Sequence, residues 1–369
     1  MIPQNKLAVY VIIFLMNSKN VENRPVFCDS DKIEKLRKKK VKEVDAFSFQ
    51  LKELFFIENP KFVGQEKEEV YKTKDFKKFS EKKENDFQYI FFPWNNSLVK
   101  CVNHEDYFKI KTNRNQDLIT LEEQKKLYDY RVAVLGMSVG SNIAFVLTQA
   151  GISREITIAD FDELDTSNLN RILAGVHQVG VKKTLIASQK IYEDNPYAGV
   201  NALPEGINKE NLEKLLKEKK IDCIVEEVDN LGVKIDVRFL AMKYKVPVLM
   251  ATDNGDGVVL HVERYDLGYN KIFHQEVGFW QEKMTSLSGG ASKEVFGEII
   301  TNMIMGGIEN VDPKVMMSVK RILNKELVSW AQLGSAAILA GVVTTFAVKK
   351  IALGEDKRLE VRSFINPTY

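Results

Sequence analysis

Acidic, basic and amide side chains between residues 160 and 229 have the types that bind a phosphate ester together with a divalent cation. An arginine holds a phosphate as a two-pronged donor and a lysine as a point charge. Carboxylate oxygens are ligands that Mg²⁺ prefers. Such groups could neutralise and align the phosphates of a nucleotide during displacement at phosphorus. The candidate set is Asp160, Asp162, Asn168, Arg171, Lys183 and Asp229.

Several of these residues also have a purely structural interpretation. Asp160 could cap the loop that follows it, and Asn168 could close a turn. Asp229 could be the N-cap of a helix that begins after Glu227. Because the residues occur together and in one order, a shared site is the favoured hypothesis.

A glycine-rich turn precedes the set, in RVAVLGMSVGSNIAFVLTQAG at 131–151. In a GxGxxG turn the first glycine makes the bend, the second lets the backbone approach phosphate, and the third lets helix pack on strand. Here Gly136 is first, Ser138 stands in the middle, and Ser141 follows Gly140, so the match is weaker. Unpaired N–H groups at a helix start still favour an anion. NAD, FAD, ATP, S-adenosylmethionine and simple tight packing all remain open.

Strands and helices alternate from residue 131 onward, which predicts right-handed crossovers and an α/β fold. We expect a Rossmann-like, mainly parallel sheet with helices on both faces. The second strand ends at Asp160, where an acid can bond ribose hydroxyls. The expected strands are 131–136, 155–160, 221–227 and 246–252, and the expected helices are 139–150, 182–195, 208–220, 233–245, 313–326 and 328–353.

Residues 1–110 are expected to form an N-terminal α+β appendage, because short apolar runs alternate there with charged ones. YIFFPWNNSLVKCV predicts a hairpin that turns at Asn95 and Asn96. The charged block 65–87 is typical of a mobile loop or a surface helix. We therefore divide the chain into the appendage 1–110, a nucleotide-binding domain 111–355 and a charged tail 356–369.

Composition argues against several classes of function. Lys and Arg number 53 against 51 Asp and Glu, and this net charge of +2 gives no reason to expect nucleic acid. Three scattered cysteines and four histidines without ligand spacing predict no disulfide scaffold and no zinc, and fit a cytoplasmic protein. Apolar stretches 7–16 and 335–348 are shorter than the roughly 20 residues that span a bilayer. We expect no membrane partner, and interpret both stretches as buried elements.

The chain resembles the ThiF/MoeB family of adenylating enzymes, which includes the activating enzymes of ubiquitin-like proteins. The resemblance rests on the glycine turn, on DFDELDTSNLNR, on the lysine in VGVKK and on EEVDN, in the family's order. NRNQDLITLEEQKKL is similar to the family's arginine-bearing entry segment. The resemblance covers roughly residues 110–265, with the terminal helix also in keeping.

The resemblance implies an enzyme that uses ATP and Mg²⁺ to activate a carboxylate as an acyl-adenylate. Arg171 and Lys183 would hold the phosphates, and Asp229 would hold Mg²⁺. Arg114 would reach the partner subunit's nucleotide, which requires a homodimer. The remaining contacts to the nucleotide would come from Gly136, Ser138, Gly140, Asp160, Asp162 and Asn168.

This chain departs from the family in having no cysteine after Cys223, so a thioester step is not expected. The adenylate would pass to an amine, another nucleophile or another protein. The acyl substrate would be a peptide, a small carrier protein or a small carboxylic acid, lying in a groove made by 253–310. MATDNGDGVVLHVERYD resembles a subgroup joined to a nitroreductase-like domain, which suggests a separate redox enzyme as a partner. Residues 1–110 would be a substrate clamp or a dimerisation element.

Two other classes of function remain as alternatives. A Rossmann oxidoreductase that binds NAD or FAD would explain the glycines and Asp160, but it leaves Arg171, Lys183 and Asp229 without a role. A non-catalytic nucleotide-binding scaffold would fit Ser138 and the missing cysteine. Nucleotide preference distinguishes the three hypotheses.

Overall fold

The computed structural model describes residues 23–286, 297, 299–329 and 331–367 of the chain. Two compact units divide it, one made of 1–125 with 188–198 and the other of 126–187 with 199–369. The apolar stretch 7–16 and part of the expected groove 253–310 lie outside the described residues.

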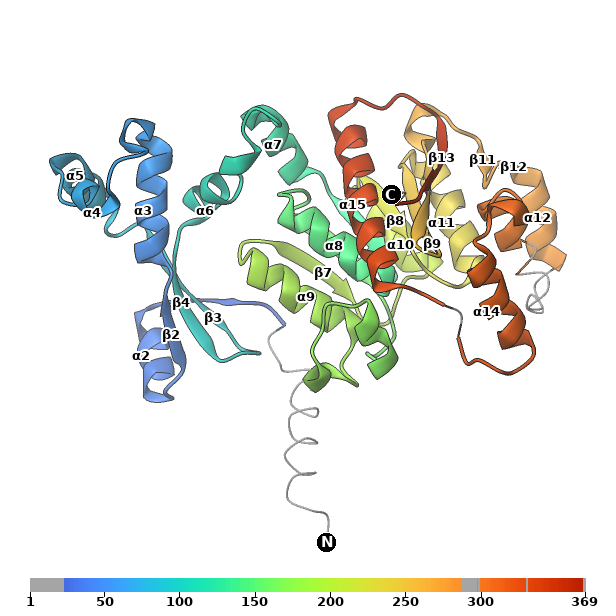
Figure 1. The fold of residues 1–369 in the computed structure, drawn as a ribbon, viewed down its shortest axis with the longest axis horizontal. Coiled ribbons are helices and arrows are strands. Elements are labelled where there is room, and N and C mark those ends of the chain that lie inside the picture. The colour runs from blue at the N-terminus through green and yellow to red at the C-terminus, as the bar shows by residue number, and fades with distance from the viewer. Residues whose placement is uncertain (1–22, 287–296, 298, 330, 368–369) are drawn as a thin grey trace, which may run out of the picture. The chain divides into compact units, whose positions relative to one another are not determined.

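The first unit contains a four-stranded sheet in the order β1-β3-β4-β2 (Figure 1). Strands β3 and β4 pair antiparallel as the expected hairpin, while β2 runs parallel to β4. Phe47, Ile90 and Val102 are buried in its core. The strands are β1 (Val26–Cys28), β2 (Lys42–Asp45), β3 (Phe87–Phe92) and β4 (Ser97–Val102).

Helices of the first unit cover part of this sheet and form a second aromatic cluster around Phe55. The charged block 65–87 forms two of them, α4 and α5, so its surface-helix interpretation is correct. The helices are α2 (Ser30–Lys38), α3 (Phe47–Glu58), α4 (Lys67–Val70), α5 (Lys74–Lys83) and α6 (His104–Lys111), with 3₁₀ turns at Pro60–Phe62 and Asn113–Asn115 and with α7 (Leu121–Asp129) crossing into the second unit.

The second unit is built on a seven-stranded sheet in the order β13-β10-β9-β8-β5-β6-β7. The five strands from β9 to β7 are parallel, and β10 and β13 add an antiparallel edge. The strands are β5 (Val132–Leu135), β6 (Glu155–Ala159), β7 (Gly199–Leu203), β8 (Cys223–Glu226), β9 (Val248–Asn254), β10 (Gly257–Glu263) and β13 (Glu360–Ile365).

Helices pack on both faces of this sheet, because side chains alternate along each strand. Ala133 and Leu135 point into a core shared with α10 and α11, whereas Val134 meets α8 at Gly140. The expected fold class is therefore confirmed. The helices are α8 (Val139–Gln149), α9 (Lys183–Asp194), which continues into the first unit, α10 (Lys209–Lys217), α11 (Leu231–Tyr244), α12 (Val277–Ser286), α14 (Pro313–Leu323) and α15 (Gly334–Leu353).

Short elements complete the second unit. They are 3₁₀ turns at Thr166–Asn170, Val176–Gln178, Tyr265–Leu267 and Ile308–Asn310, a π-helical turn at Ile300–Ile304, and the two-stranded ribbon β11 (Lys271–Ile272) and β12 (Gln275–Glu276).

Two expectations about the C-terminal part need correction. Residues 360–365 are not a tail but the edge strand β13, which pairs antiparallel with β10 from Val258 to Glu263. Helix α15 has 20 residues, so its apolar stretch is longer than expected. Among the described residues, this helix is long and apolar enough to cross a membrane by length and composition. Its apolar stretch is 56% buried, and it packs against α8, β9 and β10, which is the packed helix that we expected.

A buried ion network links β8, α11 and β10. The Glu226 carboxylate lies 2.9 Å from Lys234 Nζ and 2.7 Å from Arg238 Nη1, and Arg238 Nε lies 2.7 Å from Glu263. Arg238 is completely buried. Burial raises the pKa of Glu226, but Lys234 and Arg238 outweigh it and hold this pKa below its ordinary value.

Candidate functional site

The expected site residues of the second unit gather at the carboxyl ends of its parallel strands. Strand β5 lies in the middle of the sheet, with β6 on one side and β8 on the other. The chain therefore changes direction across the sheet next to β5, and ligands of open α/β sheets bind at such a switch point.

The turn after β5 requires glycine at two positions. Gly136 has φ +93°, and a Cβ there would lie 2.4 Å from the carbonyl oxygen of Glu227. A Cβ at Gly140 would lie 2.9 Å from Cγ1 of Val134, so this glycine lets α8 approach β5. Ser138 precedes α8 but makes no capping hydrogen bond to it. The start of α8 thus keeps its tendency to attract an anion.

Arg171 is held at the beginning of α8. Its Nε donates to Ser138 Oγ at 2.9 Å, and its Nη1 donates to Asn170 Oδ1 at 2.9 Å. Burial lowers the pKa of Arg171, and the charges of Asp253 and Asp229 oppose this effect. The guanidinium therefore hydrogen-bonds to the turn before α8, and the charges of two carboxylates act on it.

Asn168 stabilises the 3₁₀ turn Thr166–Asn170, which precedes Arg171. Its Oδ1 accepts the backbone N–H of Asp165 at 3.1 Å, and its carbonyl oxygen accepts the N–H of Arg171 at 3.0 Å. Asn168 thus closes a turn, which is the structural interpretation. Its role in positioning phosphates stays a prediction.

Lys183 stands at the first position of α9 and is paired with Asp162. The ammonium lies 2.7 Å from the carboxylate, with Lys183 8% and Asp162 50% exposed. The backbone N–H of Lys183 also donates to the carbonyl of Asp162. A phosphate that reaches Lys183 would share this ammonium with Asp162.

Asp160 accepts hydrogen bonds from the backbone on both of its oxygens. The N–H of Met137, in the glycine turn, lies 2.6 Å from one oxygen, and the N–H of Asp162 lies 2.7 Å from the other. Burial raises the pKa of Asp160, while these donors and Lys183 act against it. Asp160 therefore fixes the glycine turn against the end of β6, and ribose binding stays a prediction.

Asp229 is exposed after β8 and forms no hydrogen bond within the part of the chain that the structure describes. The N-cap of α11 is the next residue, Asn230, whose Oδ1 accepts the N–H of Val233 at 3.1 Å. The N-cap interpretation of Asp229 is therefore wrong, and its carboxylate is open to a ligand.

Two further carboxyl groups at this edge were missed in the sequence analysis. Glu227 lies under the glycine turn and accepts the N–H of Ala251 at 2.8 Å, and burial raises its pKa well above the ordinary value. Asp253 lies near the end of β9, and burial raises its pKa to about 6, against the effects of Arg171 and Gln332. An acid at the carboxyl end of a strand is the signal that had already singled out Asp160, and it could have found Asp253.

Residues 111–353 match the sequence profile described as the ThiF family. The chain belongs to the ThiF family. The resemblance to ThiF/MoeB proteins is thereby confirmed, and the glycine turn, Arg171, Lys183 and Asp229 all lie within the matched segment.

Individual relatives give the following similarities. An uncharacterized protein of Mycobacterium tuberculosis is 31% identical over 269 residues, 73% of this chain and 36% of the relative. The sulfur carrier protein ThiS adenylyltransferase of Escherichia coli is 26% identical over 163 residues, 44% of this chain and 64% of the relative. The chain thus spans less than two thirds of either relative. A solved structure of E. coli tRNA N6-threonylcarbamoyladenosine dehydratase in complex with AMP aligns with 68% of this chain and 97% of that chain, at 16% identity and a TM-score of 0.49.

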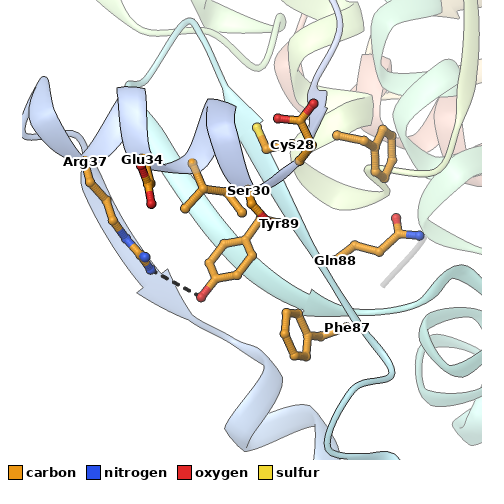
Figure 2. Close-up of a pocket in the computed structure, with 10 residues that line it drawn as sticks. Cys28, Ser30, Glu34, Arg37, Phe87, Gln88 and Tyr89 are labelled. Atoms are coloured by element: carbon orange, nitrogen blue, oxygen red, sulfur yellow. Dashed lines mark hydrogen bonds between the residues drawn. The ribbon is translucent and has the colours of Figure 1, made fainter.

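The first unit of this ThiF-family chain carries Arg114 and a hollow of its own. Arg114 is exposed in the 3₁₀ turn Asn113–Asn115. The hollow has a volume of about 730 Å³ and lies between α2 and the strands β1 and β3 (Figure 2). Arg37 crosses its wall, donating to Glu43 at 2.9 Å and to the Tyr89 hydroxyl at 3.4 Å. Phe27, 48% exposed, adds an apolar surface.

Proposed function

We propose that the chain is an ATP-dependent adenylyltransferase that activates a carboxylate as an acyl-adenylate. The observation that carries this proposal is the convergence of the Gly136 turn, Arg171 and Asp229 at one sheet edge within a ThiF-family domain. An oxidoreductase would need no such arrangement of a half-buried arginine and an open carboxylate beside the phosphate turn.

ATP supplies the adenylyl group, and the residues of the chain bind and align it. The N–H groups at the start of α8 and the Arg171 guanidinium face the phosphates, and Lys183 adds a charge that Asp162 holds in place. In the part of the chain that the structure describes, no three His, Cys, Asp or Glu side chains group as a metal site. Mg²⁺ fits here as an ion held by Asp229 together with phosphates and water, which is its usual manner of binding.

The proposed substrate is a peptide, a small carrier protein or a small carboxylic acid, and the proposed acceptor is an amine. The curated E. coli relative is an adenylyltransferase of a sulfur carrier protein. The sequence of this chain has no cysteine after Cys223, and burial raises the pKa of the Cys223 thiol. A thioester step on this chain is therefore not proposed, and a redox enzyme as partner stays a further proposal.

We also propose a cytoplasmic homodimer in which Arg114 reaches the partner subunit's nucleotide. Ile338, Val342 and Phe346 follow one another at four-residue spacing on α15 and are 51%, 51% and 54% exposed. Such an apolar stripe is suited to cover by a second copy of the chain. The hollow beside Tyr89 gives the first unit a place for a peptide, in keeping with a substrate clamp.

Lys183→Ala is expected to weaken the binding of ATP·Mg²⁺ by about ten- to a hundredfold, because one charge-assisted hydrogen bond contributes about 1.5–3 kcal/mol. Isothermal titration with ATP·Mg²⁺, NAD⁺ and NADH measures this. The control is Lys217→Ala, which removes an exposed lysine from α10 and should bind as the wild type does. Binding of NAD⁺ or NADH without ATP would show that the chain is a redox protein instead.

Mixing Arg114→Ala with Lys183→Ala is expected to restore activity, since each mixed dimer assembles one intact site. In a two-fold dimer a purified heterodimer has one intact site of two, so about half of the wild-type activity per dimer should return. Pyrophosphate exchange on heterodimers purified by two tags is the measurement. Lys183→Ala mixed with Asp229→Ala is the control. Each of these changes damages the site of the subunit that carries it, so no dimer has an intact site and no activity should return. If no activity returns in the heterodimer of Arg114→Ala and Lys183→Ala, Arg114 does not act on the partner subunit's nucleotide.

A further inference from the structure

Asp253 is an unexplained carboxylate beside the proposed nucleotide site. Both of its oxygens are shielded from solvent, and neither has a hydrogen-bond partner of normal geometry in the part of the chain that the structure describes. An unsatisfied buried polar group costs about 1–3 kcal/mol. A carboxylate kept in such a place in a functional fold calls for a role.

The backbone around Asp253 is fixed on both sides. The next residue, Asn254, donates to the carbonyl of Asn310 at 2.9 Å and accepts the N–H of Asp312 at 2.8 Å. The segment before α15 is fixed as well, because Asn170 donates to the carbonyl of Gln332 at 2.8 Å. The backbone that carries the carboxylate is thus held in position, within β9 by its pairing with Val258 and at the next residue by Asn310 and Asp312.

The charges that act on Asp253 come from two neighbouring segments. Arg171, after the turn Thr166–Asn170, is the cation that lowers its pKa, and Glu227, after β8, is a like charge whose own pKa Asp253 raises. Gln332, before α15, contributes a neutral amide. Asp229 acts on the same Arg171 guanidinium. Arg171 is therefore the shared cation of Asp253, Asp229 and any phosphate at the start of α8.

We propose that Asp253 is the resident counter-ion of Arg171 and takes up a proton from solvent when nucleotide phosphates bind to the guanidinium. The inference rests on the proposed function, because it requires a polyphosphate at Arg171. Asp253 is a positioning residue in this scheme. Within the described residues its carboxylate forms no hydrogen bond or ion pair with Arg171, and its charge acts on the guanidinium through space while no nucleotide is bound. Its protonation removes a like charge from beside the phosphates.

The sign of the pH dependence follows from the same contacts. Burial raises the pKa of Asp253 to about 6, so at pH 7.5 its carboxylate is ionised and its charge opposes the approach of a phosphate to Arg171. A phosphate nearby raises this pKa further, since like charges disfavour the ionised form. At pH values between the pKa of Asp253 in the free protein and its higher pKa in the ATP complex, ATP binding should weaken by up to about tenfold for each rise of one pH unit.

The test is isothermal titration with ATP·Mg²⁺ from pH 6 to pH 8, in buffers of different ionisation enthalpy, on wild type and Asp253→Asn. At pH 7 we expect the wild type to take up a substantial fraction of one proton, and the variant to take up less. At pH 7.5 the variant should bind ATP roughly tenfold more tightly than the wild type, because it has no carboxylate that must be protonated, and a pKa rise of one unit on binding corresponds to a tenfold change in affinity. Phosphate itself titrates near pH 6, so the difference between the two proteins is the quantity that matters.

Asp256→Asn is the matched control, because it removes the same charge from the exposed turn after β9 and should leave affinity and proton uptake as in the wild type. Thermal unfolding checks that both variants fold. Equal proton uptake by wild type and Asp253→Asn, or weaker binding by the variant, would overturn the counter-ion role while leaving the adenylyltransferase proposal in place. If the wild type binds no ATP, both proposals fail together.

Discussion

Asp229→Ala is expected to reduce Mg²⁺-dependent adenylation by on the order of a thousandfold, which is the upper range for losing one group that stabilises transition-state charge. The carboxylate is exposed and forms no hydrogen bond within the described residues, and its charge raises the pKa of Arg171. Removing it should take away the protein's ligand for the ion and leave the fold intact. Pyrophosphate exchange with a carboxylate that supports exchange in the wild type is the measurement.

The neighbouring residue provides a control that separates metal binding from helix capping. Asn230→Ala removes the N-cap of α11 and should cost about 1 kcal/mol of the free energy of unfolding. It keeps the carboxylate, so exchange should persist. Asp229→Ala should show the opposite pattern, with unchanged unfolding and lost exchange. Retained exchange in Asp229→Ala would remove this residue from the site.

Much of the second unit could be predicted because its parallel strands are short apolar runs between amphipathic helices. The run at 132–135 is buried on both faces, and such strands stand out in a sequence. Strand β7 was missed because Gly199 and Asn201 are poor strand formers, and it pairs with β6 alone. Strand β13 was missed because EVRSFI mixes charged and apolar residues, and its identity depends on pairing with β10.

The candidate site shows the same division between local and tertiary information. The order of Asp160, Asn168, Arg171 and Lys183 identified the region from the sequence alone. The sequence could not show that Asp160 and Asn168 use their oxygens on backbone N–H groups. Nor could it show that the charge of Asp253, distant in sequence, acts on Arg171, because that interaction arises only when β9 joins the sheet.

Buried charge is the feature that sequence patterns conceal most completely, and it carries the largest expected effect on stability. Arg238→Ala should lower the free energy of unfolding by about 3–5 kcal/mol, because it leaves buried carboxylates without their cation. Arg238 bridges Glu226 and Glu263 at 2.7 Å each, and its guanidinium lies 3.8 Å from the centre of the Phe273 ring. Guanidinium chloride unfolding followed by circular dichroism measures the loss.

The size of this effect depends on burial rather than on the ion pair as such, and two variants separate these causes. Arg321→Ala removes an exposed partner, paired with Glu326 at 3.3 Å, and should cost less than about 1 kcal/mol. Arg238→Met combined with Glu263→Gln removes the cation and one of the two carboxylates that it bridges, while Lys234 still pairs with Glu226. It should therefore be more stable than Arg238→Met alone, because no uncompensated carboxylate remains at Glu263. A loss of the same size in Arg238→Ala and Arg321→Ala would contradict the buried network as a stabilising element. If the double variant is no more stable than Arg238→Met, the uncompensated Glu263 carboxylate is not the cause of the loss.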